Sequence, residues 1–431
     1  MTEKKGSMDA RPGMIGSNPA IWKVNPSIRG VVAELLPSAN PGKLVISLGP
    51  GDPATYPHLF SKGREAFTEA VASAVTSTLY DSYPPPFGLP SARRATAAYL
   101  RGVVKSCGYS REHPVQLRES DVFLTVGATQ ALQAVLTILA SAGGNILLPR
   151  PGFPLYESSC ELAGLDRRYY DLLPARNWEA DPTQIRYIAD ARTLAIVVIN
   201  PNNPTGAVFS SHHLLQIAEI ARDLSIPIIA DEVYGGMVFG GGRFVPMASF
   251  AHLAPIITIG SLSKRWMVPG WRFGWLAICD RHGTLQGVRK ATEILMNLNP
   301  APASVIQAAV PSILSDANAE FHENVLAVLE PCMNTLFEGL KQIKALRCHS
   351  RPKGSMFMMV EVDTTLLHGI ESDMDFAKQL MKEESVLVLP GSIFGMKNWI
   401  RLFFGLPADL SIDACDRMNS FCERRMIRDG W

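Results

Sequence analysis

The chain has 431 residues, of which 47% are hydrophobic and 19% charged, and its formal net charge is +1. This length is enough for two domains and a large buried core. The near-neutral charge gives no reason to expect nucleic acid or a membrane surface as a partner, and no apolar run reaches the roughly 18 residues of a membrane span.

The amino-terminal segment and the cysteines limit the possible location and chemistry. Residues 1–25 are polar, contain Gly and Pro, and lack the apolar core of a signal peptide, so we expect a flexible arm there. The seven cysteines are scattered, odd in number and without C-x-x-C spacing. This argues against both a disulfide framework and a zinc site. We therefore expect a cytoplasmic protein without a bound metal.

Strand-like and helix-like segments alternate through the middle of the chain. The expected elements are a strand at 122–126, a helix at 129–140, strands at 146–148 and 194–199, a helix at 211–224, and strands at 226–230, 256–260 and 273–278. This alternation is typical of an α/β fold with a mostly parallel sheet covered by helices on both faces.

The pattern changes after the Pro- and Asn-rich residues 297–303. A long helix over 319–346 is expected to lead into a second, smaller α/β domain. Strands of its sheet are predicted at 356–362, 386–389 and 399–404.

Polar side chains follow three of the predicted parallel strands. In chain order they are Asn203, Asp231, Tyr234, Ser261, Lys264 and Arg272. Open α/β sheets bind ligands at the carboxyl ends of their strands, so these side chains are expected to share one site. Lysine is the cation whose pKa falls most readily on desolvation, which suits Lys264 to Schiff-base chemistry. The alternative for Lys264 is an ordinary surface lysine.

Four motifs in this order resemble those of the fold-type I aminotransferases, which depend on pyridoxal 5′-phosphate (PLP). They are Asn-Pro-Asn-Asn-Pro-Thr-Gly at 200–206, Asp-Glu-Val-Tyr at 231–234, Ser-Leu-Ser-Lys at 261–264 and Trp-Arg-Phe-Gly at 271–274. More narrowly, residues 148–156 and 260–272 resemble the plant-type members of the tyrosine/nicotianamine aminotransferase group. The similarity runs from about residue 27 to residue 422.

The resemblance implies three catalytic side chains. Lys264 would bind PLP as a Schiff base and then move the proton of the substrate Cα. Asp231 would pair with the protonated ring nitrogen, and Tyr234 would hydrogen-bond the ring O3′. The sequence supports the role of Asp231 independently of the resemblance. A carboxylate that follows the apolar strand 226–230 is costly to bury without a cationic partner, and the protonated ring nitrogen would be such a partner.

The resemblance also assigns the remaining contacts of PLP. Its phosphate is expected at a helix start, on the amides of Gly127 and Ala128 and the hydroxyl of Thr129, because helix amino termini bind anions. The alternative role of Thr129 is that of a helix N-cap. Val126 and Ala128 depart from the residues that the family usually has here. The other residues expected to contact PLP are Phe153, Asn203, Ser261, Arg272 and Tyr83.

Substrate contacts are expected from Arg401, Gly51 and Asn203. Arg401 interrupts an apolar strand, and its planar fork would fit a substrate α-carboxylate; the alternative is an intramolecular ion pair. Gly51 matches a glycine that lies close to that carboxylate in the family. Tyr83 matches a tyrosine that reaches the phosphate of the neighbouring subunit, which implies a homodimer with shared active sites.

The expected function is transamination of an aromatic L-amino acid, tyrosine first, with a 2-oxo acid such as 2-oxoglutarate. Three alternatives stay open: a C–S lyase acting on cysteine conjugates, a nicotianamine aminotransferase, and an inactive PLP fold that serves as a binding or scaffold protein. The resemblance divides the chain into the arm 1–25, a segment 26–75 that joins the small domain and the active-site entrance, a large PLP-binding domain 76–310 and a small carboxyl-terminal domain 311–431.

Overall fold

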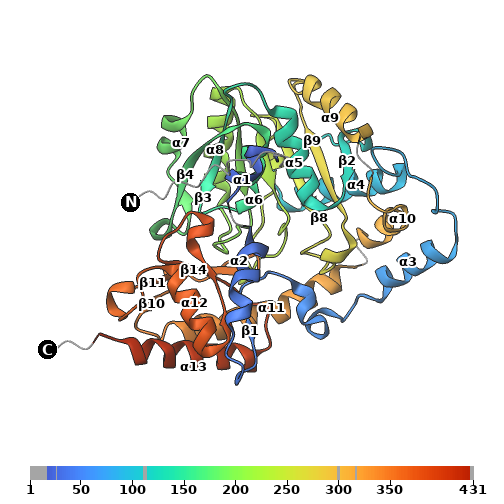
Figure 1. The fold of residues 1–431 in the computed structure, drawn as a ribbon. Coiled ribbons are helices and arrows are strands. Elements are labelled where there is room, and N and C mark those ends of the chain that lie inside the picture. Colours follow the sequence, from blue (N-terminus) through green and yellow to red (C-terminus); the bar gives the residue numbers. More distant parts are fainter. Residues whose placement is uncertain (1–16, 26, 110–113, 299–300, 316–317, 428–431) are drawn as a thin grey trace, which may run out of the picture.

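The computed structural model describes residues 17–25, 27–109, 114–298, 301–315 and 318–427, arranged as a larger and a smaller α/β layer structure (Figure 1). The predicted arm 1–25 lies partly outside the described residues. Within the described part, α1 (Pro19–Lys23) forms a short helix that packs against α6 (Pro154–Ala163).

The large domain contains a mostly parallel eight-stranded sheet, as the sequence predicts. The strand order is β2 (Val122–Thr125), β9 (Gly274–Cys279), β8 (Ile256–Ser261), β7 (Ile228–Asp231), β6 (Thr193–Ile199), β3 (Asn145–Arg150), β4 (Asp166–Leu173) and β5 (Glu179–Ala180). The strands from β8 to β4 run parallel, whereas β9 is antiparallel to both of its neighbours and β5 is antiparallel to β4.

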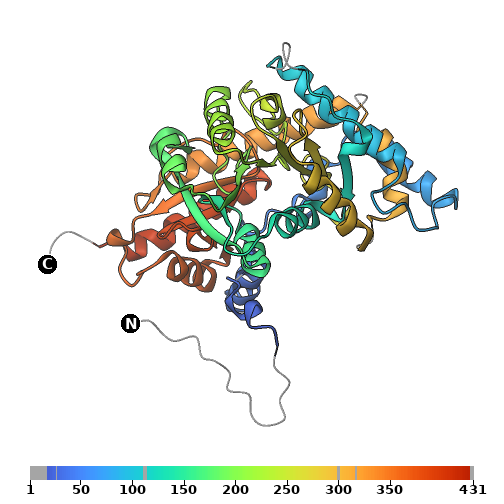
Figure 2. The same ribbon diagram turned by 90° about the horizontal axis from the view of Figure 1, so that it is seen from above.

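Helices cover both faces of this sheet (Figure 2). They are α4 (Pro90–Cys107), α5 (Gly127–Leu139), α6, α7 (Pro182–Ile188), α8 (Ser211–Leu224), α9 (Gln286–Leu298) and α10 (Ser304–Ile313). Side chains alternate between two cores because successive residues of a strand point to opposite faces. In β8, for example, Ile257 and Ile259 belong to the core beneath α5, and Ile256 belongs to the other core.

The small domain is built on an antiparallel sheet and a separate strand pair. The sheet has the order β10 (Leu346–Arg347), β11 (Phe357–Val362), β14 (Trp399–Phe403) and β13 (Leu389–Pro390), and β1 (Ile46–Ser47) pairs in parallel with β12 (Val386–Leu387). Its helices are α2 (Ile28–Leu35), α11 (Ala319–Leu340), α12 (Asp373–Glu384) and α13 (Ala408–Arg425).

Most predicted elements agree with the structure to within two residues at each end, but two differ by more. The single strand expected at 386–389 is divided, because the chain passes from β12 to β13 at Val388 and so changes its partner from β1 to β14. The helix expected over 319–346 ends at Leu340. Ile343 and Leu346 lie beyond the end of the helix and are also buried. The spacing of apolar residues therefore continues past Leu340, and the sequence does not show where the helix ends.

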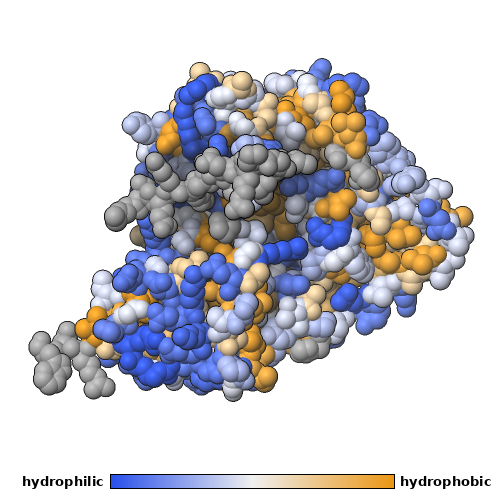
Figure 3. Space-filling view, in the orientation of Figure 1, coloured by the Kyte–Doolittle hydropathy of each residue, from blue (hydrophilic) through white to orange (hydrophobic). Residues whose placement is uncertain are grey.

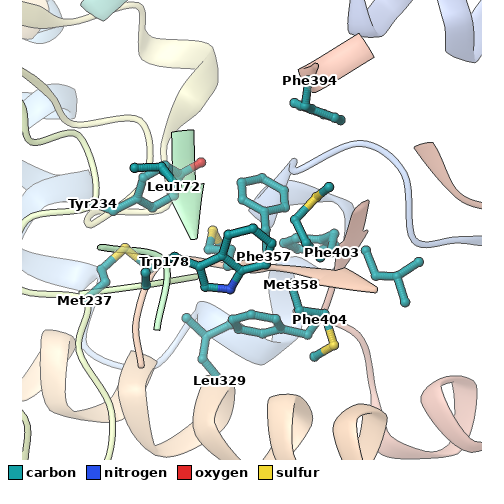
Figure 4. Close-up of a cluster of buried hydrophobic side chains, with 14 of the residues drawn as sticks. Leu172, Trp178, Tyr234, Met237, Leu329, Phe357, Met358, Phe394, Phe403 and Phe404 are labelled. Carbon is teal, nitrogen blue, oxygen red and sulfur yellow. The ribbon is translucent and has the colours of Figure 1, made fainter. Parts of the chain in front are cut away.

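A cluster of large apolar side chains joins the two domains (Figure 4). Trp178 and Tyr234 of the large domain meet Phe357 and Phe403 of the small sheet there. The Trp178 ring also packs edge-on against Trp399, with ring centroids 5.3 Å apart. Because this cluster is buried, side chains contributed by either domain are held in fixed relative positions.

The limits proposed for the domains remain a prediction. In the segment 26–75, α2 and β1 pack with α12 and β12 of the small domain, whereas α3 (Glu65–Thr76) packs against α10. Within the part of the chain that the structure describes, no helix combines the length and apolarity needed to cross a membrane.

Candidate active site

A cavity of about 380 Å³ lies at the carboxyl ends of β6, β7 and β8, where the small domain meets the sheet. The surface is visibly hollowed between the domains (Figure 3). All of the side chains expected in the site line this cavity except Gly127 and Tyr83. Those that line it are Gly51, Ala128, Thr129, Phe153, Asn203, Asp231, Tyr234, Ser261, Lys264, Arg272 and Arg401.

Lys264 follows the end of β8 and reaches across the cavity to the amino-terminal segment. Its Nζ donates a hydrogen bond to the carbonyl oxygen of Gly51. Burial lowers the pKa of Lys264 to about 8; Asp52 opposes this shift, and the positive charges of Arg401 and Arg272 add to it. Lys264 is therefore not an ordinary surface lysine, and its amine is available in the neutral form near pH 8.

Asp231 is the last residue of β7 and lies buried at the floor of the cavity. Tyr156 donates its hydroxyl proton to Oδ2 over 3.1 Å, and the backbone N–H of Val233 donates to Oδ1 over 3.3 Å. Burial raises the pKa of Asp231 to about 6. No cationic side chain of the described residues forms an ion pair with it, so this carboxylate would be stabilised by a cationic guest.

Tyr156 is a site residue that the sequence analysis did not identify. It lies inside the segment 148–156 that resembles the aminotransferase group, and this was the available signal. Its hydroxyl is buried against the Asp231 carboxylate, and that burial and negative charge raise the pKa of Tyr156 well above its ordinary value. Tyr156 therefore stays protonated and acts as a hydrogen-bond donor to Asp231.

The opposite end of the cavity lies at the start of α5, where the sequence analysis predicts an anion site for the phosphate of PLP. Thr129 is not the N-cap: the helix begins at Gly127, and the side chain of Gln130 accepts the hydrogen bond of the Val126 N–H over 2.6 Å. The Thr129 hydroxyl is therefore left to line the cavity. Gly127 has a φ of +73°, and a Cβ there would lie 2.6 Å from a terminal nitrogen of Arg272. The first-turn amides and the guanidinium thus stand side by side.

Arg401 lies in β14 and is 1% exposed. Its Nη1 donates to Oδ1 of Asn203 over 3.0 Å, and its Nη2 donates to the carbonyl oxygen of Gly49 over 2.8 Å. Its guanidinium carbon lies 3.9 Å from the ring centroid of Phe357 and 4.7 Å from that of Phe394. Burial lowers the pKa of Arg401 to about 9.

The alternative of an intramolecular ion pair for Arg401 is wrong for the described residues, since none of their carboxylates lies within 4.0 Å of it. Its Nε, in addition, has no hydrogen-bond partner among those residues. The carboxylate that the sequence analysis expects at Arg401 would supply the missing anionic partner of this buried guanidinium.

Of two further residues expected in the site, Gly51 lines the cavity and Tyr83 does not. Gly51 lies where a Cβ would fall on the Phe357 ring, so only glycine fits beside that ring. Tyr83 is 98% exposed and takes no part in lining the cavity of its own chain. Its contact with PLP stays a prediction.

The residues present fit PLP. This cofactor needs a carboxylate at its ring nitrogen, an amine for its aldehyde and an anion site for its phosphate. Asp231, which is buried without a cationic partner among the described residues, Lys264 with its lowered pKa, and the cradle of Gly127 and Arg272 supply these three features around one cavity. Among the described residues, no group of three or more His, Cys, Asp or Glu side chains could hold a metal ion.

The model of the family "aminotransferase class I and II" matches residues 44–418, and the chain belongs to this family of PLP-dependent enzymes. Nicotianamine aminotransferase 1 of Oryza sativa subsp. japonica is 47% identical over 88% of this chain and 75% of its own. S-alkyl-thiohydroximate lyase SUR1 of Arabidopsis thaliana is 38% identical over 98% of this chain and 91% of its own.

Among solved structures, tyrosine aminotransferase from Leishmania infantum has the same fold, with a TM-score of 0.88 at 31% identity; the match covers 96% of this chain and 99% of that one. The fold is thus that of the fold-type I aminotransferases. More narrowly, the protein is a PLP-dependent aminotransferase of the tyrosine/nicotianamine type.

β9 lies so close to the predicted anion site that Gly274 leaves no room for a side chain. A Cβ at Gly274 would lie 2.6 Å from the carbonyl carbon of Gly127 and 2.7 Å from the amide nitrogen of Ala128. We expect Gly274→Ala to raise the dissociation constant of PLP about tenfold or more, because overpacking costs about 1–3 kcal/mol and would displace these amides. Spectrophotometric titration of the apo-enzyme measures this constant.

Gly270→Ala is the matched control, because nothing lies within 4 Å of its added Cβ. It should leave PLP binding unchanged. Equal PLP affinities for the Gly274 and Gly270 variants would show that the contact with β9 does not position the anion site.

The lowered pKa of Lys264 can be measured directly in the apo-enzyme. A small acylating reagent reacts only with the neutral amine, so the rate at Lys264 should rise with pH and reach half its maximum near pH 8 rather than near the ordinary value of 10.5. Peptide mass spectrometry follows the modification. Asp52→Asn should move the midpoint lower, because Asp52 favours the ammonium form. A midpoint near 10.5 would contradict the burial of this amine.

Proposed function

We propose that this protein transfers the amino group of an aromatic L-amino acid, tyrosine first, to a 2-oxo acid such as 2-oxoglutarate. The observation that carries the proposal is the buried guanidinium of Arg401, which has no carboxylate partner among the described residues and lines the same cavity as Lys264, an amine with a lowered pKa. An amino acid substrate presents a carboxylate and an amine on one carbon. A cavity with a carboxylate fork and a proton-accepting amine can therefore hold that carbon between them.

Different residues of the chain have separate roles in the reaction at this carbon. PLP, when bound, supplies a carbonyl that takes up amino groups and a ring that withdraws electrons from the substrate Cα. Lys264 removes the Cα proton as a general base, and its pKa of about 8 suits that step near neutral pH. Asp231 holds a proton at the ring nitrogen, with Tyr156 fixing the carboxylate by a hydrogen bond.

Orientation of the substrate falls to Arg401 and its neighbours. The rings of Phe357 and Phe394 enclose the guanidinium, and Asn203 accepts one of its hydrogen bonds, so the fork is held in one orientation before any substrate arrives. A fixed fork places the α-carboxylate without a further loss of side-chain entropy. Asn203 and Tyr234 would contact the O3′ side of the ring.

The apolar part of the cavity wall supports an aromatic donor. Phe153 and Phe357 contribute aromatic faces, and Leu132, Leu155 and Ile28 complete that part of the lining. Rings packed against such surfaces gain both apolar burial and ring contacts.

Two other outcomes remain open for the same site, because relatives named as a nicotianamine aminotransferase and as an S-alkyl-thiohydroximate lyase share the fold. The lyase outcome requires a leaving group on the substrate Cβ and protonation away from C4′ of the cofactor.

We further propose a homodimer with shared active sites. Tyr83 supports this arrangement, because its side chain is almost fully exposed in its own subunit and yet matches a residue that contacts the neighbour's phosphate in the family.

Product analysis tests the transaminase assignment. With the holoenzyme and 2-oxoglutarate, tyrosine should yield its 2-oxo acid and an equal amount of glutamate. Cysteine conjugates should yield little pyruvate and thiol by comparison. Pyruvate and thiol as the main products, in the absence of any 2-oxo acid acceptor, would identify a lyase instead.

Arg401→Ala tests the carboxylate fork. We expect a loss of about 3–5 kcal/mol in the binding of 3-(4-hydroxyphenyl)propionate, because a buried charge pair loses one partner. Binding of 4-ethylphenol, which lacks the carboxylate, should change little. Arg401→Lys keeps the charge without the planar fork and should recover only part of the loss. If the alanine variant weakens both ligands equally, Arg401 has a structural role rather than a recognition role.

A further inference from the structure

A second and much smaller cavity lies behind the catalytic strand ends, on the side of the sheet that faces α4. Its volume is about 20 Å³, and Tyr99 of α4 forms part of its wall. Its other lining groups include Thr258 in β8, Trp275 in β9, Arg265 after β8 and Glu232 after β7. This rear niche shares Ser261 with the catalytic cavity, so the two cavities have a common wall.

Three buried polar atoms of the rear niche have no hydrogen-bond partner among the described residues. They are the hydroxyl oxygen of Thr258, the indole nitrogen Nε1 of Trp275 and Nε of Arg265. Thr258 is 2% exposed and Trp275 is 3% exposed, so bulk solvent does not reach these groups. A buried polar group without a partner is destabilising, and in folded proteins such groups are usually paired with protein atoms or with ordered water.

Neighbouring contacts prevent these atoms from turning toward other partners. The Trp275 ring lies against Gly260, where an added Cβ would fall 2.5 Å from Nε1. The Arg265 guanidinium is held by its Nη1, which donates to the Tyr99 hydroxyl over 3.0 Å and to the Gly235 carbonyl oxygen over 3.2 Å. The unpartnered atoms are therefore fixed by packing around one small space.

The size and the hydrogen-bonding groups of the rear niche fit one water molecule. A single water needs roughly 10–15 Å³ of such space and two to four polar partners. The N–H groups of Trp275 and Arg265 can only donate, whereas the hydroxyl of Thr258 can accept. The carboxyl group of Glu232 can accept as well, and its Oε1 already accepts the Met247 N–H over 2.6 Å. The niche thus offers two donors and two acceptors, which is the set that one water can satisfy.

We propose that the rear niche is a binding site for one internal water molecule. The water accepts hydrogen bonds from the N–H groups of Arg265 and Trp275. It donates its own two hydrogen bonds to the Thr258 hydroxyl and the Glu232 carboxyl group. Its four bonds then go to β8, to β9 and to the segments that follow β7 and β8. This inference concerns the scaffold behind the site and holds whichever amino acid is the donor.

The water lies between the two segments that carry Lys264 and Asp231. Arg265 directly follows Lys264 in the sequence, and Glu232 directly follows Asp231. A water bound to both Arg265 and Glu232 therefore links these two segments from behind the common wall of the cavities. Internal waters are held by several hydrogen bonds and are costly to remove, so this link is part of the folded structure.

Thr258→Val tests the proposal by the sign of its effect on stability. Valine has nearly the shape of threonine but no hydroxyl, so the bound water would lose one partner. We expect the Tm of the holoenzyme to fall by about 1 °C, the shift that one lost hydrogen bond causes in a chain of this length. If the niche is dry, the substitution removes an unpaired buried hydroxyl, and Tm stays the same or rises. That result would overturn the proposal.

Ser411→Ala is the matched control. The Ser411 hydroxyl is also buried and without a hydrogen-bond partner among the described residues, but it lines neither the rear niche nor the catalytic cavity. Its removal should therefore not lower Tm. An equal fall in Tm for both variants would count against the water, because the effect would then not depend on the niche.

A crystal structure of the holoenzyme tests the site directly. One peak of electron density is expected in the rear niche, at roughly 2.6–3.2 Å from Trp275 Nε1, Arg265 Nε and Thr258 Oγ1. In crystals grown with bromide in place of chloride, this peak should give no anomalous signal, because bromide in the niche would identify an anion site. An anomalous peak, a niche without density, or a side chain of a neighbouring subunit in the niche would each contradict the proposal.

Discussion

The structure depends on the burial of charged groups that have no opposite charge from the described chain. Asp231 lies at a strand end with only hydrogen-bond donors around it, and Arg401 lies in the small domain with only neutral acceptors. Burying such charges without a partner of opposite sign is unfavourable. A cationic group bound at Asp231 and a carboxylate bound at Arg401 would offset this cost.

The arrangement of strands explains why these charges meet. Parallel neighbours bring the carboxyl ends of β6, β7 and β8 to one edge, and the motifs follow those ends directly. The small domain then contributes Arg401 from the opposite side. The apolar cluster of Trp178, Phe357 and their neighbours fixes the two halves against each other beneath the cavity. Because the cluster is buried next to the site, the positions of both charges are determined by packing rather than by flexible loops.

Much of this arrangement could be predicted from the sequence, for identifiable reasons. Buried parallel strands are continuous apolar runs, so β6, β7 and β8 and the residues that follow them were recognisable. The N-cap role of Thr129 is wrong because α5 begins at Gly127, two residues before Thr129, and the sequence did not reveal that earlier start. The division between β12 and β13 was hidden because both pieces are equally apolar. Tyr156 was missed because its role depends on a contact with Asp231, 75 positions further along the chain.

The hydrogen bonds of Arg401 have a mechanical consequence. They connect β14 to Asn203 in the large domain and to Gly49 in the amino-terminal segment, so a single guanidinium ties together segments that are distant along the chain. A carboxylate that binds this guanidinium would take part in the same set of contacts between β14, Asn203 and Gly49. Binding of a carboxylate at Arg401 and contact between the two domains would thereby be linked in one equilibrium, because a ligand that binds only the folded state stabilises that state.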